Sequence, residues 1–167
     1  MPDMSSVDNN KQEIEKKIGE ALGLEMAAQK AVEELGSKGL LDKGGMKDKL
    51  EKMRKQANNH QTDLEELTLL PSLGLDSINI QKVANETVQK ASEMMNTYIG
   101  ENPDSSEAIE FLCLAEGGEV THYEVLSAMT KKLVKDRKLS AKVKAILEEE
   151  KKHLSLYTRL AKQIAVE

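Results

Sequence analysis

The sequence is short of the residues that proteins use to stack on nucleic-acid bases. Aromatic residues make up only 2% of its 167 residues, and tryptophan is absent. The formal net charge is -5, so the chain also lacks the basic excess that displaces counterions from a phosphate backbone. These two shortages argue against a nucleic-acid-binding protein.

Cysteine and long apolar runs are scarce as well. The one cysteine, Cys113, lies in the apolar run FLCLA and has no intrachain partner, which favours a small buried hydrophobe in a reducing compartment. The first ten residues, MPDMSSVDNN, have no apolar signal segment, and no run approaches the roughly 18 apolar residues of a membrane span. We therefore expect a cytoplasmic protein without a membrane partner.

Charged residues, at 32%, and a supply of Lys, Glu, Leu and Ala are typical of a helical protein. Prolines, glycines and capping residues divide the apolar pattern into helices. We expect a disordered tail at 1–9 and one domain at 10–167, with helices near 10–35, 46–70, 76–99, 104–135 and 140–165. Ser140 is the expected start of the last helix. No segment is typical of a strand.

The expected lengths favour one architecture. Helices of about 25 residues at 1.5 Å per residue are rods approaching 40 Å, and short connections between such rods favour antiparallel neighbours. The segment 76–99 then serves as a crossover between two helical hairpins. The fold class is therefore all-α, an antiparallel four-helix bundle with a crossover helix.

Polar residues interrupt the apolar seam near the middle of every long helix. On these seams, acids and histidines take the places of core residues: Glu25, His60, Glu119, His122, Glu150 and His153. Two of the histidines follow a glutamate by three residues, a spacing that places both side chains on one helix face. Buried carboxylates cost several kcal/mol each unless a cation compensates them. These six residues are therefore candidate ligands for one or two divalent metal ions.

Each residue alone also has a structural interpretation. His60 fits a hydrogen-bonded core histidine, and Glu25 fits a pair with a lysine at a helix edge. A polar network that fixes helix register, in a non-catalytic interaction or dimerisation protein with a degenerate metal site, is the alternative function. A metal store or sensor without turnover is a third. Apolar residues left over on the third and fourth helices are compatible with a homodimer.

Two runs carry a resemblance to a known family: VTHYEVLSAMTKKL at 120–133 and ILEEEKKH at 146–153. With the seam pattern, they resemble the ferritin-like superfamily, most closely the YciE/YciF-type stress-induced ferritin-like proteins. The resemblance implies a four-helix bundle that holds two metal ions with glutamates and Glu-x-x-His pairs. It further implies iron or manganese, with zinc also compatible, and a redox reaction with oxygen or peroxide in stress response.

The chain departs from the family pattern at two positions. Thr121 stands where the family run has a glutamate, and Ala57 stands where a Glu-x-x-His on the second long helix needs its carboxylate. Two divalent ions bring four positive charges, whereas the seams supply three carboxylates. Glu116 or Glu124 is therefore open as a fourth carboxylate or as a replacement for Glu119.

Overall fold

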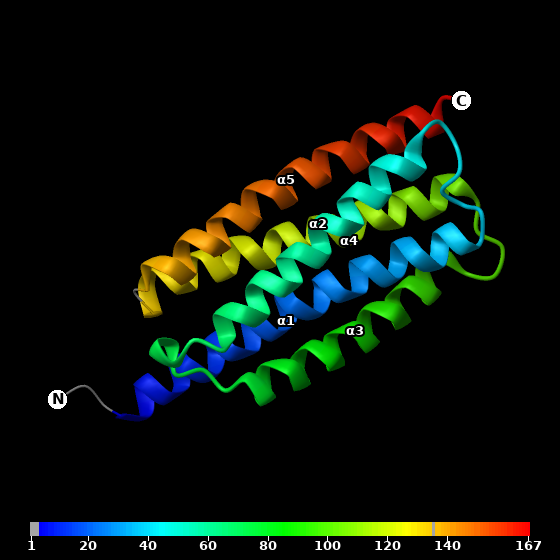
Figure 1. The fold of residues 1–167 in the computed structure, drawn as a ribbon. Helices are drawn as coiled ribbons and strands as arrows, with labels where there is room; N and C mark the ends of the chain where they lie inside the picture. The colour runs from blue at the N-terminus through cyan, green and yellow to red at the C-terminus, as the bar shows by residue number, and fades with distance from the viewer. Residues whose placement is uncertain (1–3, 135) are drawn as a thin grey trace.

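The structure is a computed structural model that describes residues 4–134 and 136–167 (Figure 1). Over this range the chain forms α1 (Met4–Ser37), α2 (Met46–Thr68), α3 (Ser77–Ile99), α4 (Ser105–Met129) and α5 (Arg137–Ala165). A 3-10 turn at Pro71–Leu73 and a π-helical turn at Thr130–Val134 complete it, and no strand occurs among the described residues. The all-α class is confirmed. No helix of the described part is long and apolar enough to cross a membrane.

The helices form a bundle of two hairpins joined by a full-length crossover (Figure 1). α1 and α2 are antiparallel, as are α4 and α5, and contacts of α1 with α4 and of α2 with α5 join the two hairpins. α3 carries the chain back between them, parallel to α1, and packs mainly on α1 from outside the bundle. The helical bundle and the crossover therefore agree with the sequence expectation.

The first helix is longer than expected. It begins at Met4 rather than at Asn10, so residues 4–9 of the expected tail are helical, and residues 1–3 lie outside the described range. Extending an existing helix by one residue costs far less than starting one, and the polar residues of this segment are only moderately poor helix formers. The sequence signal at Asn10 therefore did not set the boundary.

The expected start of the last helix at Ser140 is also wrong. α5 begins at Arg137, because the Asp136 carboxylate accepts a hydrogen bond from the Leu139 amide at 2.9 Å and so caps the first turn. The helix starts expected at 76 and 104 are confirmed, because the carboxylates of Asp76 and Asp104 cap α3 and α4 by similar bonds. The expected end of the fourth helix, Lys135, lies outside the described residues.

The apolar core is divided into two clusters along the bundle. One cluster includes Ile14, Ile18, Leu64, Leu126 and Val143, and the other includes Leu35, Leu50, Ile109, Leu112 and Leu160. The residues between them on α1 and α5 are Glu25, Glu150 and His153, all buried. A buried polar layer therefore crosses the middle of the bundle.

α1 and α3 approach each other closely at two glycines. A Cβ atom added at Gly23 would lie 2.5 Å from the carbonyl oxygen of Ala84, and one added at Gly19 would lie 2.8 Å from that of Ile80. Both distances are shorter than van der Waals contact, and the opposing atoms belong to the backbone. The crossover helix therefore depends on glycine at these positions.

We expect Gly23→Ala to lower the free energy of unfolding by about 1–3 kcal/mol, because the two helices must separate to admit the methyl group. Gly117→Ala in α4 is the matched control, since a Cβ there meets no atom within 4 Å. The control should raise stability by about 1 kcal/mol through helix propensity. Urea denaturation of both variants measures the difference, and equal effects would contradict the packing account.

Candidate metal centre

The four bundle helices each bring acid or imidazole side chains to the central polar layer. The residues that meet there, each no more than 6% exposed, are Glu25 from α1, His60 from α2, Glu116 and Glu119 from α4, and Glu150 and His153 from α5. Five of these six are ligand candidates from the sequence, and Glu116 was the open alternative. The layer therefore combines four carboxylates with two imidazoles.

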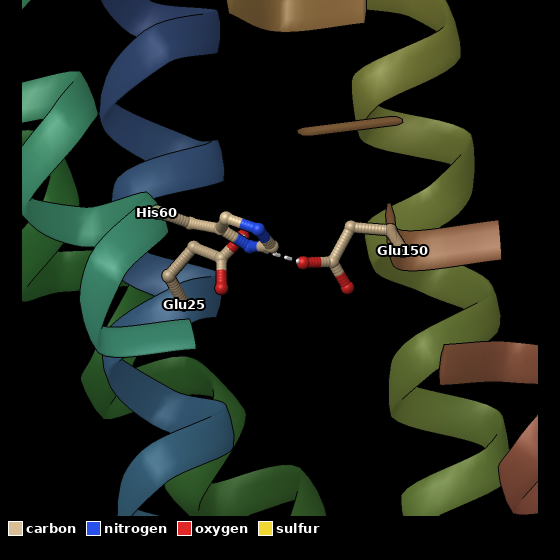
Figure 2. Close-up of side chains that lie close together, drawn as sticks. All are labelled: Glu25, His60 and Glu150. Carbon is tan, nitrogen blue, oxygen red and sulfur yellow. Dashed lines mark hydrogen bonds and ion pairs between the residues drawn. The ribbon is translucent and has the colours of Figure 1, made fainter. Parts of the chain in front are cut away.

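Glu25, His60 and Glu150 form the first set of converging ligand atoms (Figure 2). Nδ1 of His60 lies 3.1 Å from Oε1 of Glu25 and 2.7 Å from Oε1 of Glu150. Figure 2 shows the three side chains pointing toward one another, with Glu150 facing the other two. One atom from each residue lies within 4.8 Å of the others, a spacing that could hold a metal ion.

Glu116, Glu150 and His153 form the second set. Nδ1 of His153 lies 3.6 Å from Oε1 of Glu116 and 3.5 Å from Oε2 of Glu150. Glu150 therefore belongs to both sets and turns one oxygen toward each histidine. A carboxylate in this position is suited to bridging two cations.

The outer nitrogens of both imidazoles are held by residues that accept hydrogen bonds. Nε2 of His153 donates to the amide oxygen of Gln56 at 2.6 Å, and Nε2 of His60 donates to Oε2 of Glu149 at 2.5 Å. In a neutral ring this places the proton on Nε2 and leaves the lone pair of Nδ1 directed at the carboxylates. The same hydrogen-bonding pattern orients metal-binding histidines in proteins.

Sequence reasoning missed Gln56 and Glu149. Gln56 precedes His60 by one helical turn, and Glu149 directly precedes Glu150 in a charged run. Neither position interrupts an apolar seam, so periodicity gave no signal for them. Only the packing of α2 against α5 brings them to the two imidazoles.

Several carboxylate oxygens of the layer lack hydrogen-bond partners. These oxygens, unpartnered among the described residues, are Oε2 of Glu25, Oε1 of Glu116, Oε1 of Glu119 and both oxygens of Glu150. A buried unpaired carboxylate carries a desolvation cost of several kcal/mol. Two divalent ions would balance four carboxylates and take up these lone pairs, so the residues present fit a pair of metal ions.

Burial and mutual repulsion raise the pKa of three of the carboxyl groups. Burial, together with the charge of Glu150, raises the pKa of Glu25 well above 4.5. Burial raises the pKa of Glu119 well above the same value, aided by the charges of Glu116 and Glu150. Burial and the neighbouring Glu150 carboxylate raise the pKa of Glu116 to about 8. Without a cation, these groups hold protons that a metal ion would displace.

The pKa values of the two imidazoles and of Glu150 shift in the direction that favours the charged form of each group. Burial lowers the pKa of His60, but the close carboxylates of Glu150 and Glu25 outweigh burial and raise it to about 11. Burial also lowers the pKa of His153, but the neighbouring carboxylates of Glu116 and Glu150 outweigh burial and raise it to about 9. Burial raises the pKa of Glu150, yet the close side chains of Glu116, His153 and His60 hold it below its ordinary value. Glu150 is therefore the carboxylate that stays ionised.

The structure does not bring His122 to the polar layer. Its imidazole is partly exposed, contacts the carbonyl oxygen of Gly118 and lies 3.0 Å from Oε2 of Glu20 on α1. His122 directly precedes Tyr123, and neighbouring residues on a helix point about 100° apart. The buried face of α4 passes through Glu119 and Tyr123, so the seam expected through His122 was wrong in this part.

The open choice among the other glutamates of α4 is decided by burial. Glu116 and Glu119 are both buried, whereas the Glu124 side chain is 53% exposed and pairs with Lys151 at 3.1 Å. Glu116 therefore supplies the fourth carboxylate without replacing Glu119. The three carboxylates expected from the seams would not balance the charge of two divalent ions. With Glu116, the layer has the four carboxylates that would balance it.

A tyrosine also reaches the layer. The Tyr123 hydroxyl, fully buried, donates a hydrogen bond to Oε1 of Glu25 at 2.8 Å. Tyr157 is buried beside Glu116 and Glu119 and lines the cavities next to them.

Comparison of the chain with protein-family models, with curated proteins and with solved structures finds no match. Membership of the ferritin-like superfamily therefore stays a prediction from the sequence.

We expect the metal-free protein to lose stability as the pH rises from 6 to about 9. The folded-state pKa of Glu116, about 8, and that of His153, about 9, lie above the ordinary values of 4.5 and 6.5. The folded state therefore binds these protons more tightly than the unfolded state does. The stability that this tighter binding contributes is lost as the pH rises through the folded-state pKa values. Glu150, with its lowered pKa, stays ionised throughout this window.

Urea denaturation at a series of pH values tests this expectation. Glu116→Gln should flatten the pH dependence, whereas Glu124→Gln at the exposed position should leave it unchanged. A free energy of unfolding that stays constant or rises between pH 6 and 9 in the metal-free protein would contradict the account.

Proposed function

We propose that the protein binds two divalent metal ions, iron or manganese, in the polar layer and that the loaded site reacts with oxygen or peroxide in a stress response. The ligand geometry supports the first part, and the resemblance to the YciE/YciF-type proteins supports the second. The observation that carries the proposal is that Glu150 belongs to two converging ligand sets at once.

In this proposal each residue has a defined task. Glu25 and His60 would hold one ion, Glu116 and His153 would hold the other, and Glu150, which belongs to both ligand sets, would contribute to each. Glu119 completes the four negative charges. Carboxylate and imidazole ligands together suit iron, manganese and zinc, and of these iron and manganese supply one-electron redox chemistry. Glu149 and Gln56 keep the two rings oriented, and Tyr123 steadies Glu25.

The alternative is a non-catalytic helical protein whose polar layer only fixes the register of the bundle. That function requires the two histidines to satisfy four buried carboxylates without a metal ion. The five carboxylate oxygens without partners among the described residues argue against such a network.

We expect the protein to contain about two divalent ions per chain after expression with added metal, the number that balances four carboxylates. Glu150→Gln should remove most of this metal, because the variant keeps the shape of the side chain but loses the shared charge. Elemental analysis of the purified proteins measures the content. Metal binding should also raise the melting temperature, since the ions bind only the folded state.

Glu124→Gln is the matched control for metal content. It changes an exposed glutamate of α4 that pairs with Lys151, and it should bind as much metal as the wild type. A wild-type protein with almost no metal would rule out the proposal and favour the register-fixing network. Equal metal content in Glu150→Gln and the wild type would rule out the assigned ligands.

We further expect protein loaded with ferrous iron under anaerobic conditions to be oxidised by oxygen or peroxide faster than ferrous iron in buffer. The ordered carboxylates stabilise the higher charge of ferric iron, which favours electron loss. Colorimetric assay of the remaining ferrous iron follows the reaction. Oxidation no faster than in buffer, in a protein that does bind iron, would leave a store or sensor as the function.

A further inference from the structure

A cavity of about 50 Å³ lies beside the polar layer, between α1, α3 and α4. Its outer end is bordered by the exposed residues Lys30 and Glu34, and its inner end by the buried residues Glu116, Glu119 and Tyr157. It therefore lies between exposed residues of the surface and the carboxylates of the candidate metal centre.

The walls of this cavity are apolar and built from small side chains. Five alanines line it, namely Ala27, Ala28, Ala31, Ala91 and Ala115, together with larger residues such as Met95 and Phe111. Apolar cavities of protein interiors stay free of water and bind apolar gases. A volume of about 50 Å³ admits a molecule of a few atoms, because one water-sized probe occupies about 10–15 Å³ by the same measure.

The inner end of the cavity is polar and unpaired. Oε1 of Glu119 and Oε1 of Glu116 are buried, and neither has a hydrogen-bond partner among the described residues. Glu116 belongs to the second ligand set, so a molecule at the inner end lies next to that set. The cavity thus joins an apolar passage to the atoms that would hold the metal.

A second, smaller cavity shares Glu116, Glu119 and Tyr157 with the first but has a different character. It measures about 10 Å³, room for about one water molecule. Arg54, Glu150 and His153 are among its lining residues. It suits water or another polar molecule, whereas the larger cavity does not.

We propose that the larger apolar cavity is the access route and holding site for dioxygen at the metal centre. This inference rests on the proposed function and specifies its oxidant. Dioxygen is a diatomic apolar molecule that fits the volume and the walls, whereas peroxide would give up hydrogen bonds to water along the apolar passage, at a cost of several kcal/mol. In the net reaction, dioxygen takes two electrons from two ferrous ions and two protons from solvent, and leaves as hydrogen peroxide.

Two variants that narrow the cavity test this proposal. Ala91→Leu on α3 and Ala27→Leu on α1 each add three carbon atoms to the larger cavity, and neither residue lines the smaller one. Ala145→Leu is the matched control at an exposed helical position. All three variants should contain as much metal as the wild type, because none changes a ligand.

Xenon binding, followed by xenon NMR on the metal-free proteins, tests the cavity independently of iron chemistry. The wild type and Ala145→Leu should bind xenon, and the two cavity variants should not. Oxidation of the ferrous-loaded proteins then tests the oxidant. Dioxygen should react about tenfold more slowly with the two cavity variants than with the wild type, while peroxide should react at an unchanged rate.

Each contrary outcome has a distinct meaning. Absence of xenon binding in the wild type, or an unchanged dioxygen rate in both cavity variants, would overturn the dioxygen route and leave the metal site standing. An equal slowing with dioxygen and peroxide would overturn it as well. Xenon binding without oxidation by either reagent would instead overturn the proposed function and, with it, the assignment of dioxygen.

Discussion

The rest of the structure depends on the burial of four carboxylates in one layer of a helical bundle. Glu25, Glu116, Glu119 and Glu150 are all removed from water between two apolar clusters, which would be among the costliest arrangements a small protein can contain without compensation. Two imidazoles offset part of this charge and hold Glu150 in its ionised form. The remaining oxygens without partners are where a cation would have the largest effect, and they connect the fold with the proposed metal-binding function.

The architecture around this layer separates stability from chemistry. The two apolar clusters lie on either side of the layer and hold the hairpins together, so the layer need not contribute apolar packing of its own. The crossover helix α3 lies outside the bundle, held against α1 by the glycine contacts. From that position it supplies one wall of the apolar cavity without adding a ligand. Besides connecting the two hairpins, α3 therefore forms part of the cavity beside the candidate metal centre.

Sequence periodicity predicted the buried polar residues well on three helices and poorly on the fourth. On α1, α2 and α5 a clear apolar seam surrounds Glu25, His60 and Glu150, so an interruption of the seam is easy to recognise. α4 is apolar around most of its circumference near FLCLAEGGEV, and its seam was placed one residue away from the buried face at Glu116 and Tyr123. Because of that offset, His122 was among the candidate ligands and Glu116 was only an alternative. Gln56 and Glu149 were missed because they lie beside the seams.

By itself the sequence determined that the chain is helical, where two of its helix caps lie and which residues share a helix face, because these properties depend on spacings of three or four residues. Only the tertiary structure decided which side chains meet. His60 and Glu25 are 35 positions apart, and Tyr123 and Glu25 are 98 apart, so their contacts follow from how whole helices pack. The sharing of Glu150 and the orientation of both imidazoles are further results of that packing. The helical repeat fixes only the direction of each side chain around its own helix axis. A metal centre depends in addition on the distances between side chains of four different helices.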